Sequence, residues 1–195
     1  IEESVIRYNS DYGIRGYYVP GGNNNENANI SVTNTQIVDN YRHGIHATED
    51  YGKWEITGCK ILRNGEYGIH FRETYAQTIK NNEIKKNKYG LYLANNHGVR
   101  TVSGNEISEN TSDGMWMGYN NGEVRIIDNK INSNGGNGLE SSSTIYNVLE
   151  VKNNEIKDNK GHGFARWDRD RQNVIFQENQ IENNEGVGVY FNLYL

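Results

Sequence analysis

Short bursts in which apolar and polar residues alternate run along the whole chain, and none is long enough to form a helix. Asn, Gly and Lys separate the bursts, so each burst predicts a short β-strand followed by a turn. The bursts repeat with a fixed period, marked by Ile6, Ile37, Ile61, Ile84, Ile107, Ile131, Ile156 and Ile181. From Ile37 onward the spacings are 24, 23, 23, 24, 25 and 25 residues, which indicates stacked structural repeats.

Asparagine and glycine occupy fixed places in every repeat. An asparagine follows each marker isoleucine by three residues, at Asn9, Asn40, Asn64, Asn87, Asn110, Asn134, Asn159 and Asn184. A glycine followed by an apolar residue stands further on, at Gly13, Gly44, Gly68, Gly90, Gly114, Gly138, Gly163 and Gly188. Asparagine tolerates a left-handed backbone and can form side-chain hydrogen bonds between stacked turns. We therefore expect asparagine ladders at the turns.

The repeat predicts an all-β parallel β-helix of about eight coils, each of 23–25 residues with three short strands and Asn-lined turns. The patterns of leucine-rich, hexapeptide and calcium-binding nonapeptide repeats do not occur in the chain. The first spacing, 31 residues, is longer, and we expect residues 17–29 to form an inserted loop. We expect residues 1–195 to be a single domain, a fragment or module of a larger protein whose neighbouring domains or subunits cap the open coil ends.

Composition and charge narrow the function classes. The formal net charge is −5, whereas a nucleic-acid surface needs a basic face, so no nucleic-acid partner is expected. No run approaches 18 apolar residues, so no membrane span is expected. Cys59 is the single cysteine, which leaves no disulfide framework and no cysteine metal cluster.

The repeated motifs, such as "NNEIKKNKYGLYL" at 81–93 and "NNEIKDNKGHGFAR" at 153–166, resemble those of the right-handed parallel β-helix superfamily. That group includes pectate lyases, polygalacturonases, alginate lyases, mannuronan C5-epimerases and phage tailspike depolymerases. The resemblance covers nearly the whole chain and lies in the structural repeat. It implies chemistry on a polysaccharide, an extracellular or cell-surface location, and a substrate groove along the strand that follows the repeat glycine.

Alternation along the post-glycine strand predicts which side chains face outward in that groove. The first outward column contains Arg15, His46, His70, Tyr92, Trp116, Glu140, Ala165 and Tyr190. A second column, two residues further on, contains Tyr17, Thr48, Arg72, Ala94, Gly118, Ser142, Trp167 and Asn192. The inward residues are apolar in most coils. The exception, Arg166, is interpreted as a bulge that shifts the register, with a paired buried charge as the alternative.

Four residues of these columns are candidates for catalysis. Elimination or C5 epimerisation of a uronate needs a cation on the carboxylate, a base for the C5 proton and an acid. Arg72 could neutralise the carboxylate, His70 or His46 could be the base, and Tyr92 the acid. The alternative is a stacked surface ladder without catalysis. The two histidines could also be metal ligands, but no third ligand stands out at a suitable spacing.

Substrate-binding residues are expected along the same face. The rings of Trp116 and Trp167, together with that of Tyr92, could pack against sugar C–H faces, with Glu140 and Arg15 as polar neighbours. Packing of the rings on one another within the ladder is the alternative.

The carboxylates offer a second chemistry. Glu49 and Glu73 occupy equivalent turn positions in adjacent coils, a spacing compatible with a retaining glycosidase pair. Asp50 could join them as a ligand of Ca²⁺, although the elimination or epimerisation by side chains requires no cofactor.

The leading hypothesis is a polysaccharide-active domain with lyase or C5-epimerase chemistry on acidic glycans. The rival is a non-catalytic spike, adhesin or surface-layer module that binds a glycan.

Overall fold

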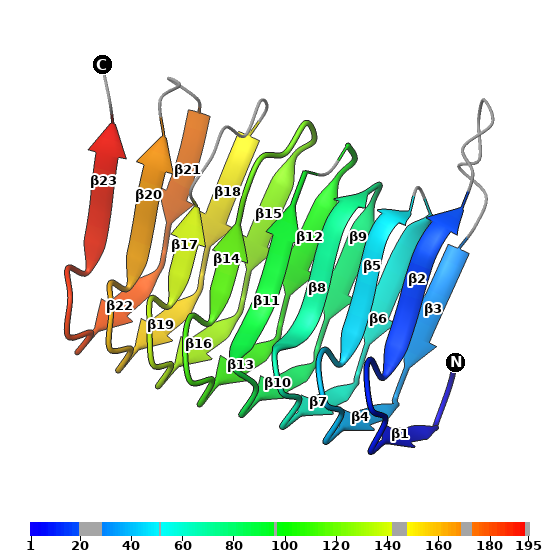
Figure 1. The fold of residues 1–195 in the computed structure, drawn as a ribbon. Coiled ribbons are helices and arrows are strands. Elements are labelled where there is room, and N and C mark those ends of the chain that lie inside the picture. Colours follow the sequence, from blue (N-terminus) through cyan, green and yellow to red (C-terminus); the bar gives the residue numbers. More distant parts are fainter. Residues whose placement is uncertain (20–28, 51, 96, 142–147, 169–172, 194–195) are drawn as a thin grey trace.

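The computed structural model describes residues 1–19, 29–50, 52–95, 97–141, 148–168 and 173–193. All regular structure in these ranges is β, arranged in three parallel sheets that wind into a rod with the two termini at opposite ends (Figure 1).

Each sheet takes every third strand of the chain. The first sheet contains β1 (Val5–Arg7), β4 (Gln36–Val38), β7 (Lys60–Leu62), β10 (Glu83–Lys85), β13 (Glu106–Ser108), β16 (Lys130–Asn132), β19 (Glu155–Lys157) and β22 (Gln180–Glu182). The second, here called the post-glycine sheet, contains β2 (Ile14–Val19), β5 (Ile45–Asp50), β8 (Tyr67–Thr74), β11 (Tyr89–Ala94), β14 (Met115–Met117), β17 (Leu139–Ser141), β20 (Phe164–Asp168) and β23 (Val189–Leu193). The third contains β3 (Asn29–Thr33), β6 (Lys53–Thr57), β9 (Gln77–Lys80), β12 (Arg100–Ser103), β15 (Val124–Ile127), β18 (Val148–Lys152) and β21 (Asn173–Gln177).

The predicted parallel β-helix is confirmed. Seven sets of three strands are complete within the described residues and an eighth has two strands, so the predicted count of about eight is slightly high for complete coils. The expected insert at 17–29 begins and ends in strand, because β2 extends to Val19 and β3 starts at Asn29. Residues 20–28 lie outside the described residues.

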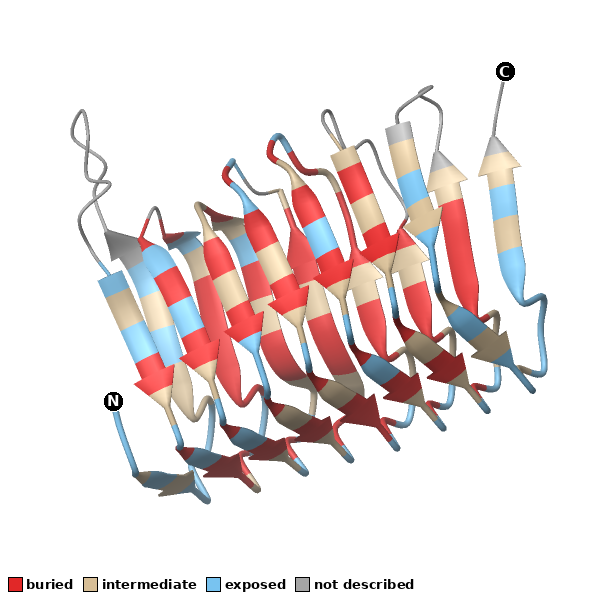
Figure 2. Ribbon diagram, turned by 180° about the vertical axis from the view of Figure 1, so that it is seen from behind, coloured by how far each residue is buried: buried red, intermediate tan, exposed pale blue. Residues whose placement is uncertain are grey.

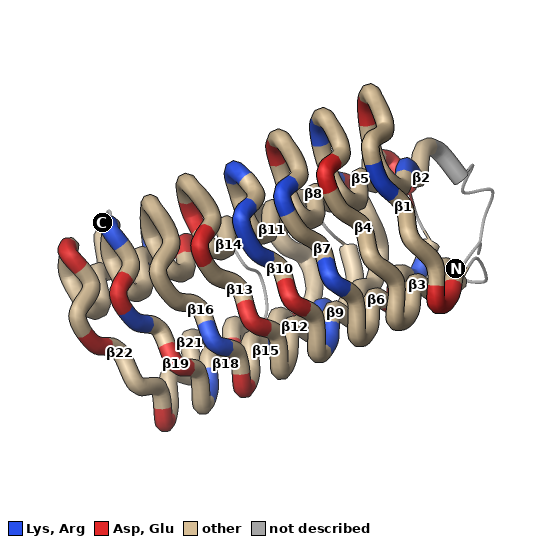
Figure 3. Tube along the Cα trace, turned by 90° about the horizontal axis from the view of Figure 1, so that it is seen from below, with Lys and Arg blue, Asp and Glu red and all other residues tan. Residues whose placement is uncertain are grey.

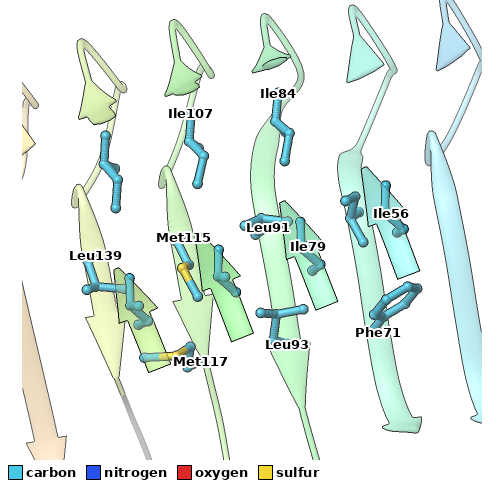
Figure 4. Close-up of a cluster of buried hydrophobic side chains, with 14 of the residues drawn as sticks. Ile56, Phe71, Ile79, Ile84, Leu91, Leu93, Ile107, Met115, Met117 and Leu139 are labelled. Carbon is cyan, nitrogen blue, oxygen red and sulfur yellow. The ribbon is translucent and has the colours of Figure 1, made fainter. Parts of the chain in front are cut away.

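The marker isoleucines fill the interior. Ile84 and Ile107 pair directly between β10 and β13 and have no exposed surface. Figure 4 shows such residues stacked coil upon coil, with Leu91 and Met115 of the post-glycine sheet packed beside them. Each buried side chain of this size contributes about 1.5–3 kcal/mol. Burial is greatest in the middle coils, whereas β1 and β22 at the two ends are largely exposed (Figure 2).

Two asparagine ladders line the turns, as predicted. Asn87 is typical: its side-chain amide donates to the Oδ1 of Asn110 at 3.3 Å and to the carbonyl of Ile61 at 3.1 Å. A second ladder runs through Asn82, Asn105, Asn129, Asn154 and Asn179.

The expected left-handed backbone is one residue away from its predicted place. The ladder asparagines are not left-handed; the residue before each one is, for example Lys86 (φ 58°) before Asn87 and Glu109 (φ 56°) before Asn110. The ladder residue must aim both its amide and its backbone N–H at the next coil, so the preceding residue makes the corner.

The prediction of a bulge at Arg166 is wrong. Arg166 continues the regular register, opposite Ser141 on one side and Phe191 on the other, and its side chain is buried. Arg100 is a second buried arginine that the sequence did not single out. Its Nε donates to Gln77 Oε1 at 2.7 Å, and complete burial lowers its pKa to about 9.

Charged residues of both signs are interspersed along the turns of the first sheet (Figure 3). Pairs such as Lys85 with Glu106, at 2.7 Å, join adjacent coils there. The Glu106 side chain is 46% exposed, and an ion pair with so exposed a partner contributes little to stability.

Candidate functional site

The first outward column exists as predicted. The strand register aligns Arg15 with His46, His46 with His70, and His70 with Tyr92, and it continues through Trp116, Glu140, Ala165 and Tyr190. The rings of the column stack on one another. Centroid distances are 4.9 Å from His46 to His70, 4.6 Å from His70 to Tyr92 and 4.6 Å from Tyr92 to Trp116.

A third column, which the sequence analysis did not predict, lies beside the first. It contains the residue before each repeat glycine: Tyr12, His43, Tyr67, Tyr89, Asp113, Asn137, His162 and Val187. The signal was present in the sequence as the tripeptides Tyr-Gly-Ile, His-Gly-Ile, Tyr-Gly-Ile and Tyr-Gly-Leu in the first four repeats.

The repeat glycine brings the first outward column and the column of preceding residues together. At Gly90 and the following Leu91, both backbone N–H groups donate to the next coil, to Asp113 and Gly114, as happens in a β-bulge. The bulge breaks the in–out alternation, so Tyr67 and His70, three residues apart, lie on one side with ring centroids 5.0 Å apart. Glycine is needed here because a Cβ on Gly90 would lie 2.2 Å from the carbonyl oxygen of Gly114.

The densest part of the site is a histidine cluster, defined here as His43, His46 and His70. The His43 ring lies 5.0 Å from that of His46 and 5.1 Å from that of His70. Tyr12 stacks on His46 at 4.6 Å and closes the cluster at one end. The Nδ1 atoms of His46 and His70 are buried and have no hydrogen-bond partner.

Burial keeps the cluster neutral. It lowers the pKa of His43 to about 3, helped by the neighbouring imidazoles. Burial likewise lowers the pKa of His46 to about 4, with Arg15 and Arg42 adding to the effect, and that of His70 to about 4, with His46 adding to it. At neutral pH each imidazole therefore carries a lone pair that can accept a proton.

Phenols and guanidinium groups border the cluster. Burial, together with Tyr89 and Tyr92, raises the pKa of Tyr67 to about 12, so its hydroxyl stays protonated. Arg72 is half-exposed and pairs with Glu73 at 3.2 Å. Arg42 donates from Nη1 to the Tyr12 hydroxyl at 3.0 Å and pairs with Glu66 at 3.5 Å.

Of the predicted substrate-binding residues, Trp116 and Glu140 lie together beside Tyr92. Tyr92 has both ring faces covered, by His70 and Trp116, so a sugar would meet its edge rather than its face. Trp116 donates from Nε1 to Glu140 at 3.1 Å. Glu140 also accepts from Asn137 at 2.6 Å, and burial raises the pKa of its carboxyl.

Trp167 and Arg15 lie apart from this network. The Trp167 ring is tilted against Tyr190, with centroids 5.0 Å apart, near the C-terminal end of the rod. The Arg15 guanidinium lies over the Tyr12 ring at 5.4 Å, near the other end.

The three candidate calcium ligands do not converge. Glu49 and Glu73 are equivalent, both with a left-handed backbone beside the aligned pair Thr48 and Arg72. Asp50, expected to join Glu49 and Glu73 as a calcium ligand, is buried. It ends β5 with a buried carboxylate that accepts from Trp54 Nε1 at 3.2 Å, because the packed indole needs an acceptor. Calcium binding stays a prediction.

A depression of about 660 Å³ lies elsewhere, at the turns that flank the third sheet. It is lined by residues that include Tyr75, His97 and Val99, and none of its lining residues belongs to the histidine cluster.

The fold and the stacked outward columns define the class: a right-handed parallel β-helix. The chain belongs to the family described as right-handed β-helix region, which matches residues 1–119 and 44–193. A search of curated proteins finds no match. No helix among the described residues is long and apolar enough to cross a membrane.

Two solved structures are similar to this chain. The periplasmic alginate epimerase AlgG has a TM-score of 0.51 at 18% identity, over 94% of this chain and 48% of that one. The A-module of the Azotobacter vinelandii mannuronan C-5 epimerase AlgE6 has a TM-score of 0.47 at 15% identity, over 100% of this chain and 58% of that one. The chain thus spans about half the length of these proteins, and the likeness is one of fold.

Proposed function

We propose that this β-helix acts on an acidic polysaccharide by removing the C5 proton of a uronate, as a lyase or a C5-epimerase. The observation that carries the proposal is the surroundings of His70. A neutral imidazole stands 5.0 Å from the ring of the protonated phenol Tyr67 and two residues from the cation Arg72.

Each group matches one requirement of the reaction. The C5 proton becomes acidic when its carboxylate is neutralised, which a guanidinium such as Arg72 can do. His70 or His46 takes the proton, since both are neutral at pH 7. Tyr67 or Tyr92 then gives a proton, either to the leaving oxygen in elimination or back to C5 in epimerisation.

The resemblance in fold to an alginate epimerase described as periplasmic supports a polyuronate substrate and a location outside the cytoplasm. The covered ring faces of Tyr92 favour recognition through ring edges, hydroxyls and charges rather than through sugar stacking.

The rival function, a glycan-binding module without turnover, is favoured by one observation. The imidazoles are packed in a ring stack that also stabilises the ladder, as a purely structural column would be.

The test is incubation of the chain with polyuronates and neutral glycans. Ultraviolet absorbance of an unsaturated product identifies a lyase, and solvent deuterium at C5 by NMR identifies an epimerase. New reducing ends without absorbance would indicate a hydrolase and overturn the proposal, and so would binding without turnover.

Four variants assign the residues. His70→Ala and Arg72→Ala should abolish turnover, whereas the matched controls His97→Ala and Arg125→Ala, outside the post-glycine sheet, should keep it. Unchanged rates in His70→Ala or Arg72→Ala would refute the assigned roles.

A further inference from the structure

The histidine cluster has a property that proton transfer does not use. His43, His46 and His70 each have a ring nitrogen that lies within 4.8 Å of a ring nitrogen of the other two. His46 and His70 come from the same position of β5 and β8, and His43 reaches them from the turn before β5. Among the described residues, no other three His, Cys, Asp or Glu side chains converge in this way.

The free nitrogens point to a ligand. The buried Nδ1 atoms of His46 and His70 have no hydrogen-bond partner, and leaving a buried polar atom without a partner is unfavourable. Most buried polar atoms in proteins have a partner, so two such atoms in one cluster need an explanation. A cation coordinated by these two atoms would give both of them a partner.

A carboxylate stands beside the cluster and can offset the charge. Glu66 Oε2 lies 3.2 Å from His43 Nδ1, and its side chain is 38% exposed. Arg42 and Arg15 are also nearby and act against a cation, and Arg42 is already paired with Glu66 and Asp11. The carboxylate of Glu66 is therefore needed for charge balance.

We propose that His43, His46 and His70 bind one divalent transition-metal ion, with Glu66 as an adjacent carboxylate. Imidazole ligands suit Zn²⁺, Co²⁺, Ni²⁺ and Cu²⁺ rather than Ca²⁺ or Mg²⁺. Three histidines around zinc at about 2.0–2.1 Å leave a fourth position for water or a carboxylate. Tetrahedral ligands at that distance are about 3.3 Å apart, whereas the histidine nitrogens are up to 4.8 Å apart, so side-chain rotation must bring them closer by up to about 1.5 Å.

The inference does not rest on the proposed function, because metal binding is measured without any glycan. It has a consequence for that function: a metal on His46 and His70 occupies the lone pairs that would accept the C5 proton. If both proposals hold, zinc inhibits turnover and a chelator restores it.

The test uses the whole chain after treatment with a chelator. Titration with Co²⁺ should give visible ligand-field bands of a four- or five-coordinate ion that saturate at one ion per chain. Zn²⁺ should displace the Co²⁺, and calorimetry with Zn²⁺ should give the same stoichiometry.

Variants separate this site from the other histidines. His43→Gln and His46→Gln should each weaken binding by more than about tenfold, which is the lower end of what the loss of an outer-shell partner alone costs. The double variant His97→Gln/His162→Gln is the matched control and should bind as the wild type does, because neither residue belongs to the cluster. Cys59→Ser should also be unchanged, since the Cys59 thiol is buried.

A thermal measurement guards against variants that fail to fold. Zn²⁺ should raise the Tm of the wild type and of His97→Gln/His162→Gln, and leave that of a folded His43→Gln variant unchanged. Absence of saturable binding by the wild type, or binding that survives His43→Gln and His46→Gln, would overturn the proposal.

Discussion

His46 and His70 are 24 residues apart in the chain, yet they occupy the same position of adjacent strands with their ring centroids 4.9 Å apart. The relationship follows from the period of the repeat, because one coil of the helix returns the chain to the same place one strand further along. Side chains in one column are therefore neighbours in space, and a substitution in one coil should alter the packing of the side chain at the same position of the next coil.

Acid should destabilise the protein through the histidine cluster. The folded pKa values, about 3 for His43 and about 4 for His46 and His70, lie below the ordinary value of 6.5. Between about pH 4 and 6.5 the unfolded chain thus binds more protons than the folded one. The free energy of unfolding should rise with pH through this window and be fully present above pH 6.5.

Urea unfolding at several pH values measures this dependence. The slope should correspond to as many as three protons taken up on unfolding. A variant with all three cluster histidines changed to Gln should lose most of the slope, and His97→Gln/His162→Gln should keep it. Equal slopes in the two variants would mean that the cluster is not the cause.

Removing one rung of an asparagine ladder should be costly. Asn110→Ala leaves the backbone N–H of Asn87 and the carbonyl of Ile84 without their buried partner. At about 1–3 kcal/mol for each unpaired group, we expect a loss of about 3 kcal/mol or more. The neighbouring exposed substitution Thr111→Ala should stay within about 0.5 kcal/mol in the same chemical unfolding experiment.

The repeat glycines should differ in their tolerance of a methyl group. Gly90→Ala would place a Cβ 2.2 Å from a backbone oxygen that cannot move without breaking the coil-to-coil ladder. We expect a loss of about 3 kcal/mol, at the upper end of overpacking costs. In Gly188→Ala the nearest atom to the new Cβ, Ile181 Cγ2, is 3.7 Å away, so its Tm should stay close to that of the wild type.

The buried charge of Arg100 should not be needed for stability. Its Nη2 is buried with no hydrogen-bond partner, and no carboxylate contributes to the shift of its pKa. Arg100→Met should therefore be as stable as the wild type or up to about 2 kcal/mol more stable, because replacing a buried ion by an apolar side chain is often neutral or favourable.

Gln77→Ala should have the opposite effect. It removes the Oε1 acceptor that lies 2.7 Å from Arg100 Nε, so the buried guanidinium loses a hydrogen bond. In a protein that keeps Arg100, this should lower the free energy of unfolding by about 2 kcal/mol. The double variant Arg100→Met/Gln77→Ala should recover part of that loss. A strongly destabilised Arg100→Met would show that the charge has a structural role.

The sequence by itself determined the period, the three strands in each coil, the inward isoleucines and the column from Arg15 to Tyr190. These depend on local alternation and on spacing, which a repeat displays directly in its sequence. The residues before the repeat glycines are also visible in the sequence. Strict alternation did not predict that they lie beside the outward column.

Only the tertiary structure decided which of these residues meet. The bulge at each repeat glycine turns Tyr67 and His43 toward His70, and coil-to-coil packing covers the faces of Tyr92 and buries Asp50 against Trp54. Burial then shifts the pKa values of the imidazoles, since the loss of water disfavours their charged form. These effects arise from contacts between coils, where the neighbours of a side chain are set by the path of the backbone and not by its own repeat.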